Sequence, residues 1–151
     1  MEEEVRVIVY VCDCGVNIAG LLDTAELARF SRKLPNVVFA DKYLSLCTSG
    51  GAAAIKKAID DNKANRVVVA ACTPKTHEPV FRAVLEECGL NPNYLEFVNI
   101  REHVSYVHTD DREGAMNAAK DLIRAGVKRA AELEIVPQKR VSVTNNAVVI
   151  G

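Results

Sequence analysis

The chain has 151 residues, of which 49% are hydrophobic and 26% charged, a composition typical of one globular domain with its own core. Its 19 basic and 20 acidic residues leave a net charge of −1, which disfavours a nucleic acid as partner. No apolar run approaches the roughly 20 residues that span a bilayer, and the acidic start is wrong for a signal peptide. We therefore expect a cytoplasmic protein with reduced thiols, in which clustered cysteines favour a metal over disulfides.

Apolar, β-branched segments alternate with amphipathic segments along most of the chain. In chain order, we expect a strand at 5–11, a helix at 23–33, a strand at 37–40, a helix at 52–62, a strand at 67–71, a helix at 77–88, a strand at 94–100 and a helix at 112–132. This alternation predicts an α/β fold of the doubly wound, flavodoxin- or Rossmann-like kind, with a parallel four-stranded sheet and helices on both faces. With right-handed crossovers we expect the strand order 2-1-3-4.

The third helix carries clear boundary signals. Thr76 is expected to cap it, and Pro79 would fall in its first turn, where proline is tolerated. Gly89 is expected to end it.

The end of the chain has a different composition. Residues 1–134 form the expected α/β domain, and residues 135–146 are expected to be a linker. Residues 147–151 begin another apolar strand that stops at Gly151. Because the first glycine of a dinucleotide-binding G-x-G-x-x-G turn follows such a strand, we expect Gly151 to open a second, truncated domain of that kind.

Four of the five cysteines fall where an expected strand ends. Cys12 and Cys14 follow the first strand, Cys47 follows the apolar run from Val37, and Cys72 follows the third strand. The carboxyl ends of parallel strands share one edge, and ligands bind there where the strand order reverses. Four thiols at that edge favour a metal or iron–sulfur centre, and the C-x-C spacing fits zinc less well than C-x₂₋₄-C.

Cys88 is expected to be a packing residue instead. The helix that leaves Cys72 carries it about 17 Å back along the sheet. A helix C-terminus also disfavours a thiolate.

Other residues are expected at the same edge. Gly50 and Gly51 after Cys47 open a helix whose free N–H groups could serve a thiolate, a sulfide or a simple anion site. His77 is a candidate ligand, proton carrier or surface residue. Arg101 and His103 flank Glu102. This segment is expected either to contain an ion pair at the start of a helix or to form a docking surface.

A specific resemblance rests on three motifs, in the order and spacing of a known family. They are Tyr-Val-Cys-Asp-Cys-Gly-Val-Asn-Ile-Ala-Gly at 10–20, Val-Val-Val-Ala-Ala-Cys-Thr-Pro-Lys-Thr-His-Glu-Pro-Val-Phe-Arg at 67–82 and Asn-Ile-Arg-Glu-His-Val-Ser-Tyr-Val-His at 99–108. With them, the chain from about residue 5 to residue 151 resembles the N-terminal domain of the A-type subunit of heterodisulfide reductase. This resemblance implies an iron–sulfur flavoprotein, part of an oxidoreductase of the kind that reduces the CoB–CoM heterodisulfide in methanogenesis.

The resemblance also implies a role for each site residue. Cys12, Cys14, Cys47 and Cys72 would hold one [4Fe–4S] cluster that relays single electrons to or from the adjacent flavin domain. FAD would bind beyond this chain, in the domain that Gly151 opens. No catalytic residue is expected here, and this chain alone is not expected to turn over substrate. The implied partners are other heterodisulfide reductase subunits and a hydrogenase- or dehydrogenase-type electron donor, with an oligomer in the holoenzyme.

Two positions depart from the family pattern. Asp13 stands where relatives often have His, and Val104 stands where many have Cys. If the cysteine at position 104 is a ligand in relatives, the site in this chain depends on the four remaining cysteines, and four cysteines suffice for a cubane cluster. A structural Cys₄ zinc site and a metal-free module that docks the flavin domain are the alternatives.

Overall fold

Four parallel strands form the central sheet of the computed structural model, which describes residues 4–137 and 139–150. The strands are β1 (Val7–Cys12), β2 (Val37–Tyr43), β3 (Arg66–Ala71) and β4 (Leu95–Asn99). They are arranged in the order β2-β1-β3-β4 and all neighbours pair in parallel, which confirms the expected topology.

The two central strands explain this order. Every residue of β1 and β3 is buried, and both strands consist largely of valine, alanine and isoleucine. Such runs need cover on both faces, which only a central position between helical layers supplies. The edge strand β2 carries exposed polar residues instead, at Asp41 and Lys42.

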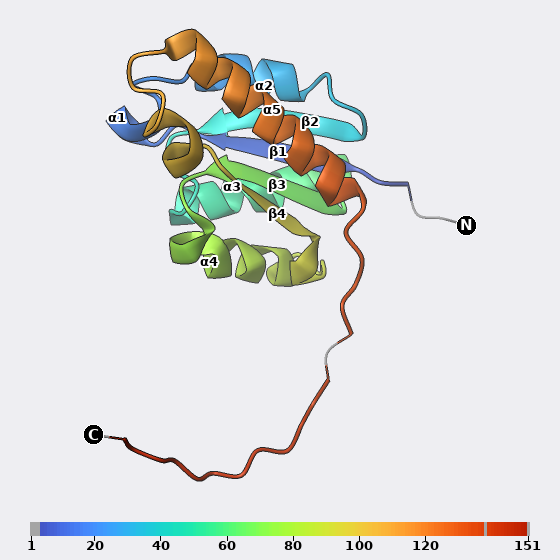
Figure 1. The fold of residues 1–151 in the computed structure, drawn as a ribbon. Coiled ribbons are helices and arrows are strands. Elements are labelled where there is room, and N and C mark those ends of the chain that lie inside the picture. Colours follow the sequence, from blue (N-terminus) through green and yellow to red (C-terminus); the bar gives the residue numbers. More distant parts are fainter. Residues whose placement is uncertain (1–3, 138, 151) are drawn as a thin grey trace.

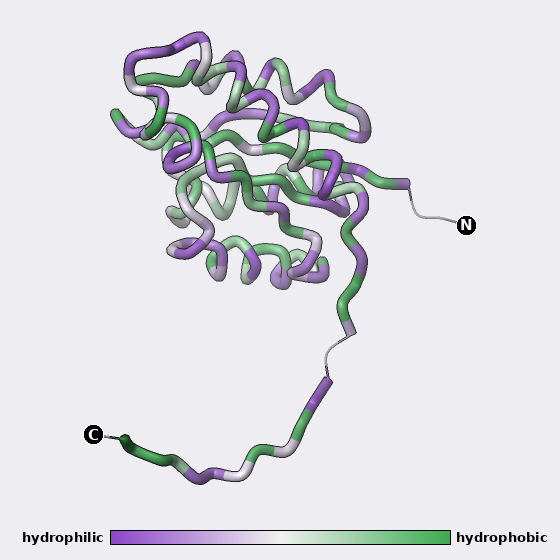
Figure 2. The backbone as a smooth tube through the Cα atoms, viewed as in Figure 1, coloured by the Kyte–Doolittle hydropathy of each residue, from purple (hydrophilic) through white to green (hydrophobic). Residues whose placement is uncertain are grey.

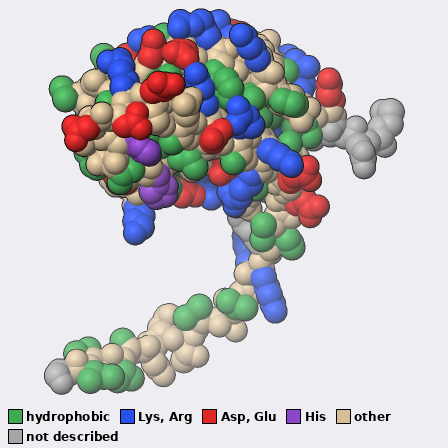
Figure 3. Space-filling model, turned by 45° about the horizontal axis from the view of Figure 1, so that its top comes forward, with side chains coloured by type: hydrophobic (Ala, Val, Ile, Leu, Met, Phe, Trp, Pro, Cys, Tyr) green, Lys and Arg blue, Asp and Glu red, His purple; other side chains and the backbone are tan. Residues whose placement is uncertain are grey.

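Helices cover both faces of the sheet (Figure 1). They are α1 (Gly15–Ile18), α2 (Thr24–Ser31), α3 (Ser49–Asn62), α4 (Pro74–Glu87) and α5 (Arg112–Ala131). The pair α2 and α5 packs on one face, and α3 and α4 pack on the other. Figure 3 is turned toward the side of α2 and α5, where basic and acidic side chains are interspersed.

The start of α4 corrects one prediction. Thr73, not Thr76, caps the helix, because its side chain accepts a hydrogen bond from the Lys75 N–H at 3.3 Å. Pro74 then occupies the first helical turn, where its fixed φ favours helix initiation, and Pro79 lies inside the helix instead. The predicted end is confirmed, since Gly89 has a φ of 74° and terminates the helix after Cys88.

After α5 the chain leaves the domain as an extended tail (Figure 1). Residues 139–150 contain no helix or strand and are exposed, and Figure 2 shows that the tail ends in a hydrophobic stretch. The strand expected from residue 147 has no neighbouring strand among the described residues and stays a prediction, and Gly151 lies outside them. In the part of the chain that the structure describes, no helix has both the length and the apolar character that crossing a bilayer requires.

Candidate metal centre

The inner part of the candidate centre lies where β1 and β3 end side by side. Cys12 is the last residue of β1 and only 5% exposed, and half-buried Cys72 directly follows β3. Val11 pairs with Ala70 in the ladder, so both cysteines leave neighbouring strands at the carboxyl edge. The placement expected from the strand pattern is therefore found for these two residues.

The outer part comes from two loops. Cys14 is half-buried and immediately precedes the single turn α1. Cys47 is exposed in the loop between β2 and α3, with its Sγ 3.7 Å from the Ser45 Oγ. The four thiols thus range from the buried Cys12 to the exposed Cys47.

The loop that carries Cys47 folds over Cys12. Its Leu46 is fully buried, and the Leu46 backbone lowers the pKa of the Cys12 thiol against the effect of burial. Gly51 in the first turn of α3 permits this path, because a Cβ there would collide with the Leu46 backbone. Sequence reasoning found the glycines but missed Leu46, whose role depends on a backbone contact that side-chain type does not reveal.

Electrostatic coupling links the four thiols. The pKa of Cys12 is raised to about 11, chiefly by burial, which the Leu46 backbone opposes. The neighbouring Cys14, Cys72 and Cys47 contribute in the same direction as burial, because a second negative charge nearby is unfavourable. Burial also raises the pKa of Cys72, while the positive charge of Arg101 lowers it. Without a metal these two thiols are therefore neutral at pH 7, and a bound cation would displace their protons.

The donor set consists of four cysteine sulfurs. Soft thiolate donors of this kind bind zinc, Cu(I) and iron–sulfur clusters. Among the described residues, no three His, Cys, Asp or Glu side chains are grouped closely enough to hold one metal ion.

Asp13 lies between Cys12 and Cys14 and connects the end of β1 to neighbouring elements. Its carboxylate accepts a hydrogen bond from the Thr24 hydroxyl at 2.5 Å and forms an ion pair with Lys42 at 2.8 Å. The hydrogen bond with Lys42 holds the pKa of Asp13 below its usual value. The C-x-C turn is therefore tied to both α2 and β2.

Val104 has a packing role. It is fully buried in a single π-helical turn, η2 (Arg101–Ser105), which follows β4. A cysteine at this position would therefore begin from a buried backbone site.

The remaining candidates take simpler positions. Arg101 and Glu102 form an ion pair, which was one of the two alternatives for this segment, and His103 is exposed. His77 lies in α4, half-buried and one turn after Cys72. Cys88 is the C-cap of α4, where it packs against the edge of the core, as predicted.

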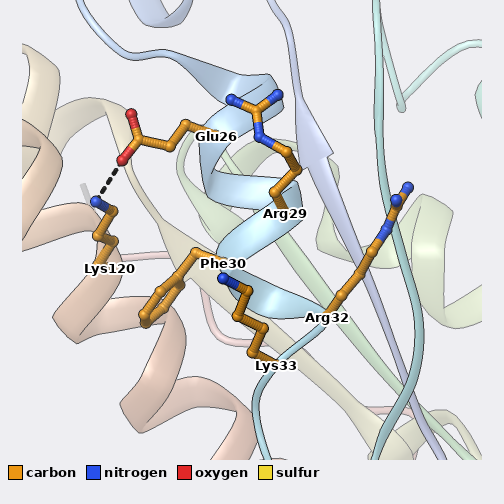
Figure 4. A pocket seen from close by; sticks show the side chains of 6 residues that line it. All are labelled: Glu26, Arg29, Phe30, Arg32, Lys33 and Lys120. Atoms are coloured by element: carbon orange, nitrogen blue, oxygen red, sulfur yellow. Dashed lines mark hydrogen bonds and ion pairs between the residues drawn. The ribbon is translucent and has the colours of Figure 1, made fainter.

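A separate hollow of about 440 Å³ lies on the face formed by α2 and α5 (Figure 4). The residues that line it are Glu26, Arg29, Phe30, Arg32, Lys33 and Lys120. Lys120 bridges the two helices through its 2.5 Å contact with Glu26, while Arg29 and Arg32 point away from that pair. It shares no residue with the cysteine edge.

The fold and its edge define the class: a doubly wound α/β domain with cysteines at the switch point of the sheet. No protein-family model matches the chain. It is 50% identical over 150 residues to an iron-sulfur A-type subunit of the CoB–CoM heterodisulfide reductase of Methanopyrus kandleri, a match that covers 99% of this chain and 22% of that protein. It is 51% identical over 146 residues to the corresponding iron-sulfur protein of Methanocaldococcus jannaschii (97% and 22%). A third relative is the A-type subunit of the H₂:CoB–CoM heterodisulfide, ferredoxin reductase of Methanothermobacter marburgensis, 50% identical over 149 residues (99% and 23%).

The chain is therefore a homologue of one region of the heterodisulfide reductase A-type subunit. It spans about a fifth of the length of the curated relatives that it matches.

Proposed function

We propose that this chain is the electron-transfer domain of a heterodisulfide reductase A-like subunit, with a [4Fe–4S] cluster on Cys12, Cys14, Cys47 and Cys72. The observation that carries the proposal is the position of Cys12 and Cys72 at the ends of neighbouring strands, with Cys14 and Cys47 in the two adjoining loops. When bound, such a cluster supplies one-electron transfer. No residue of this chain is assigned a bond-making step on substrate.

The protein residues have distinct tasks in this proposal. Cys12 and Leu46 form the inner wall of the site, because both side chains are buried. Cys47 faces solvent from its loop and leaves the outer side open. Burial and hydrogen bonds to sulfur are two of the properties that set the potential of a cluster.

The rest of the full-length protein would supply the remaining functions. We propose that FAD binds in a domain after Gly151 and that the complex is an oxidoreductase built with other heterodisulfide reductase subunits and a hydrogenase- or dehydrogenase-type donor. Apolar side chains at the thiol edge support such contacts: Val16 is 87% exposed, Leu44 71% and Val107 66%. Exposed apolar groups beside a functional site favour burial against a partner.

Anaerobic expression followed by iron, sulfide and zinc analysis tests the proposal. We expect about four iron and four sulfide per chain, a broad visible absorption and an EPR signal on reduction. Serine variants of Cys12, Cys14, Cys47 and Cys72 should lose iron, whereas Cys88→Ser, the matched control, should keep it. Stoichiometric zinc without iron would replace the proposal with a structural zinc site, and four free thiols with no effect of chelator would replace it with a metal-free docking module.

A further inference from the structure

The turn that carries Cys12 and Cys14 is fixed by hydrogen bonds within the protein. The Asp13 N–H donates to the Tyr43 carbonyl oxygen at 2.8 Å, which continues the β1–β2 ladder one residue past Cys12. The Gly15 N–H donates to the Asp13 carbonyl oxygen at 2.8 Å, and Cys14 lies between them with φ −70° and ψ 87°. These angles are close to those of an inverse γ-turn, so the backbone at both cysteines follows one defined path.

The side chain of Asp13 connects this turn to two other elements. Its Oδ1 accepts a hydrogen bond from the Thr24 hydroxyl at 2.5 Å, and its Oδ2 lies 2.8 Å from the Lys42 Nζ. Thr24 is the first residue of α2 and is only 3% exposed, whereas Lys42 lies in the edge strand β2. A single carboxylate therefore joins β1, α2 and β2 at the residue between two of the candidate ligands.

These contacts have more effect than those of an exposed surface ion pair. The Asp13 side chain is only 19% exposed, and both of its oxygens have a partner. Hydrogen bonds to a charged group are stronger than neutral ones. Because Thr24 is buried, removing the carboxylate would also leave its hydroxyl without this acceptor. We therefore expect the loss of Asp13 to loosen the turn itself.

The loop of Cys47 provides a contrast. Cys47 is exposed, and its Sγ lies 3.7 Å from the Oγ of Ser45 in the same loop. A ligand on such a loop can adjust to a bound group, whereas the positions of Cys12 and Cys14 are set in advance by their neighbours. Residues that hold ligands in this way influence a metal centre without binding it.

We infer that Asp13 is a positioning residue that holds Cys12 and Cys14 in the geometry in which they bind the cluster. The inference rests on the proposed function for the nature of the bound group. Asp13 is not itself assigned as a ligand, because Thr24 and Lys42 occupy both of its oxygens.

The first test measures the thiols in the metal-free chain. Iodoacetamide labelling, followed by peptide mass spectrometry, gives a separate rate for each cysteine. Asp13→Ala should increase the labelling rate of half-buried Cys14 about threefold to tenfold, because the turn opens more often. Cys88 at the end of α4 should keep its rate, which separates a local opening from a loss of the whole fold.

Two further variants divide this effect between the two contacts. Lys42→Met removes the ion pair, and Thr24→Val removes the hydroxyl donor. Each alone should increase the rate at Cys14 less than Asp13→Ala does. Combined with Asp13→Ala, neither should increase it further, because the shared partner is already absent.

The second test uses the iron-loaded chain. Asp13→Ala should lose its cluster to a chelator about threefold to tenfold faster and should alter the EPR spectrum of the reduced cluster. Asp13→Asn keeps an acceptor oxygen for Thr24 and should restore part of the wild-type behaviour. Lys57→Met is the matched control, since it breaks the ion pair with Asp61 on α3 and should change neither reading.

Several results would overturn the inference while the proposed function stands. They are a wild-type labelling rate at Cys14 in a folded Asp13→Ala, an equal increase at Cys88, and an equal effect in Lys57→Met. A wild-type EPR spectrum with a wild-type rate of cluster loss in Asp13→Ala also overturns it. If Asp13→Ala does not fold, an unchanged rate at Cys14 in Lys42→Met decides against it. A wild-type chain that takes up no iron removes the proposed function, and the labelling rates alone then decide whether Asp13 positions the two thiols.

Discussion

Gly126 of α5 is expected to be intolerant of alanine, although alanine is the better helix former. The glycine is buried against the sheet, and a Cβ added there would lie far inside van der Waals contact of the Val98 Cγ2 atom of β4. Replacing a helix-interior glycine by alanine stabilises by about 0.5–1 kcal/mol. Overpacking against a side chain fixed in a strand costs about 1–3 kcal/mol. Gly126→Ala should therefore lower the free energy of unfolding by about 1–2 kcal/mol.

A double-mutant cycle with Val98→Ala isolates this contact. Val98→Ala alone should cost about 2 kcal/mol, because it removes buried methyl groups. In that background the added methyl has space, so Gly126→Ala should become stabilising and the two changes should couple by about 2 kcal/mol. Urea unfolding of all four metal-free proteins, followed by circular dichroism, measures these values. A stabilising Gly126→Ala in the wild-type background, or an equal cost in both backgrounds, would refute the reasoning.

Three further predictions concern local features. Burial raises the pKa of Glu96, and Arg129 offsets this effect only in part. The contribution of Glu96 to the free energy of unfolding is therefore full below the unfolded pKa near 4.5 and is lost as pH rises through the folded pKa. Urea unfolding at several pH values should show a smaller loss of stability with rising pH in Glu96→Gln than in the wild type, and an equal loss in both would contradict this. Thr73→Ala removes the cap of α4 and should cost about 1 kcal/mol in the same assay, whereas no loss would mean that Pro74 alone starts the helix. Gly89→Ala places a Cβ at a φ of 74° and should cost about 1 kcal/mol; a neutral result would show that the turn can relax.

The sheet could be predicted from sequence because its signals are local and redundant. The fully buried runs of β1 and β3 can only be central strands, and the intervening helices impose parallel pairing. The turns α1 and η2 could not be predicted, because single turns show no periodicity and tertiary contacts such as Ser105 to Asn17 hold them. The start of α4 was missed because Thr73 and Thr76 both suit a cap, and Pro74 decides between them.

For the candidate site, the sequence predicts which cysteines lie at the edge of the sheet but not how deeply each thiol is buried. Strand ends predict which cysteines share an edge, and the structure places Cys12 and Cys72 there. How deeply each thiol is buried depends on the path of the Leu46 loop, which a close backbone contact at Gly51 permits. The part of β4 that ends beside Cys72 likewise follows from the strand register, which pairs Ala71 with Asn99, and not from sequence distance.

The gradient from buried Cys12 to exposed Cys47 has a consequence for maturation of the protein. Reagents that approach from solvent reach Cys47 first, whereas Cys12 becomes accessible only when the Leu46 loop opens. Under the proposed function, we therefore expect Cys12 to be the last of the four thiols to be loaded. Oxidative damage to the empty protein would proceed from Cys47 inward, so a chain can lose the ability to be loaded while its fold and its innermost thiol stay intact.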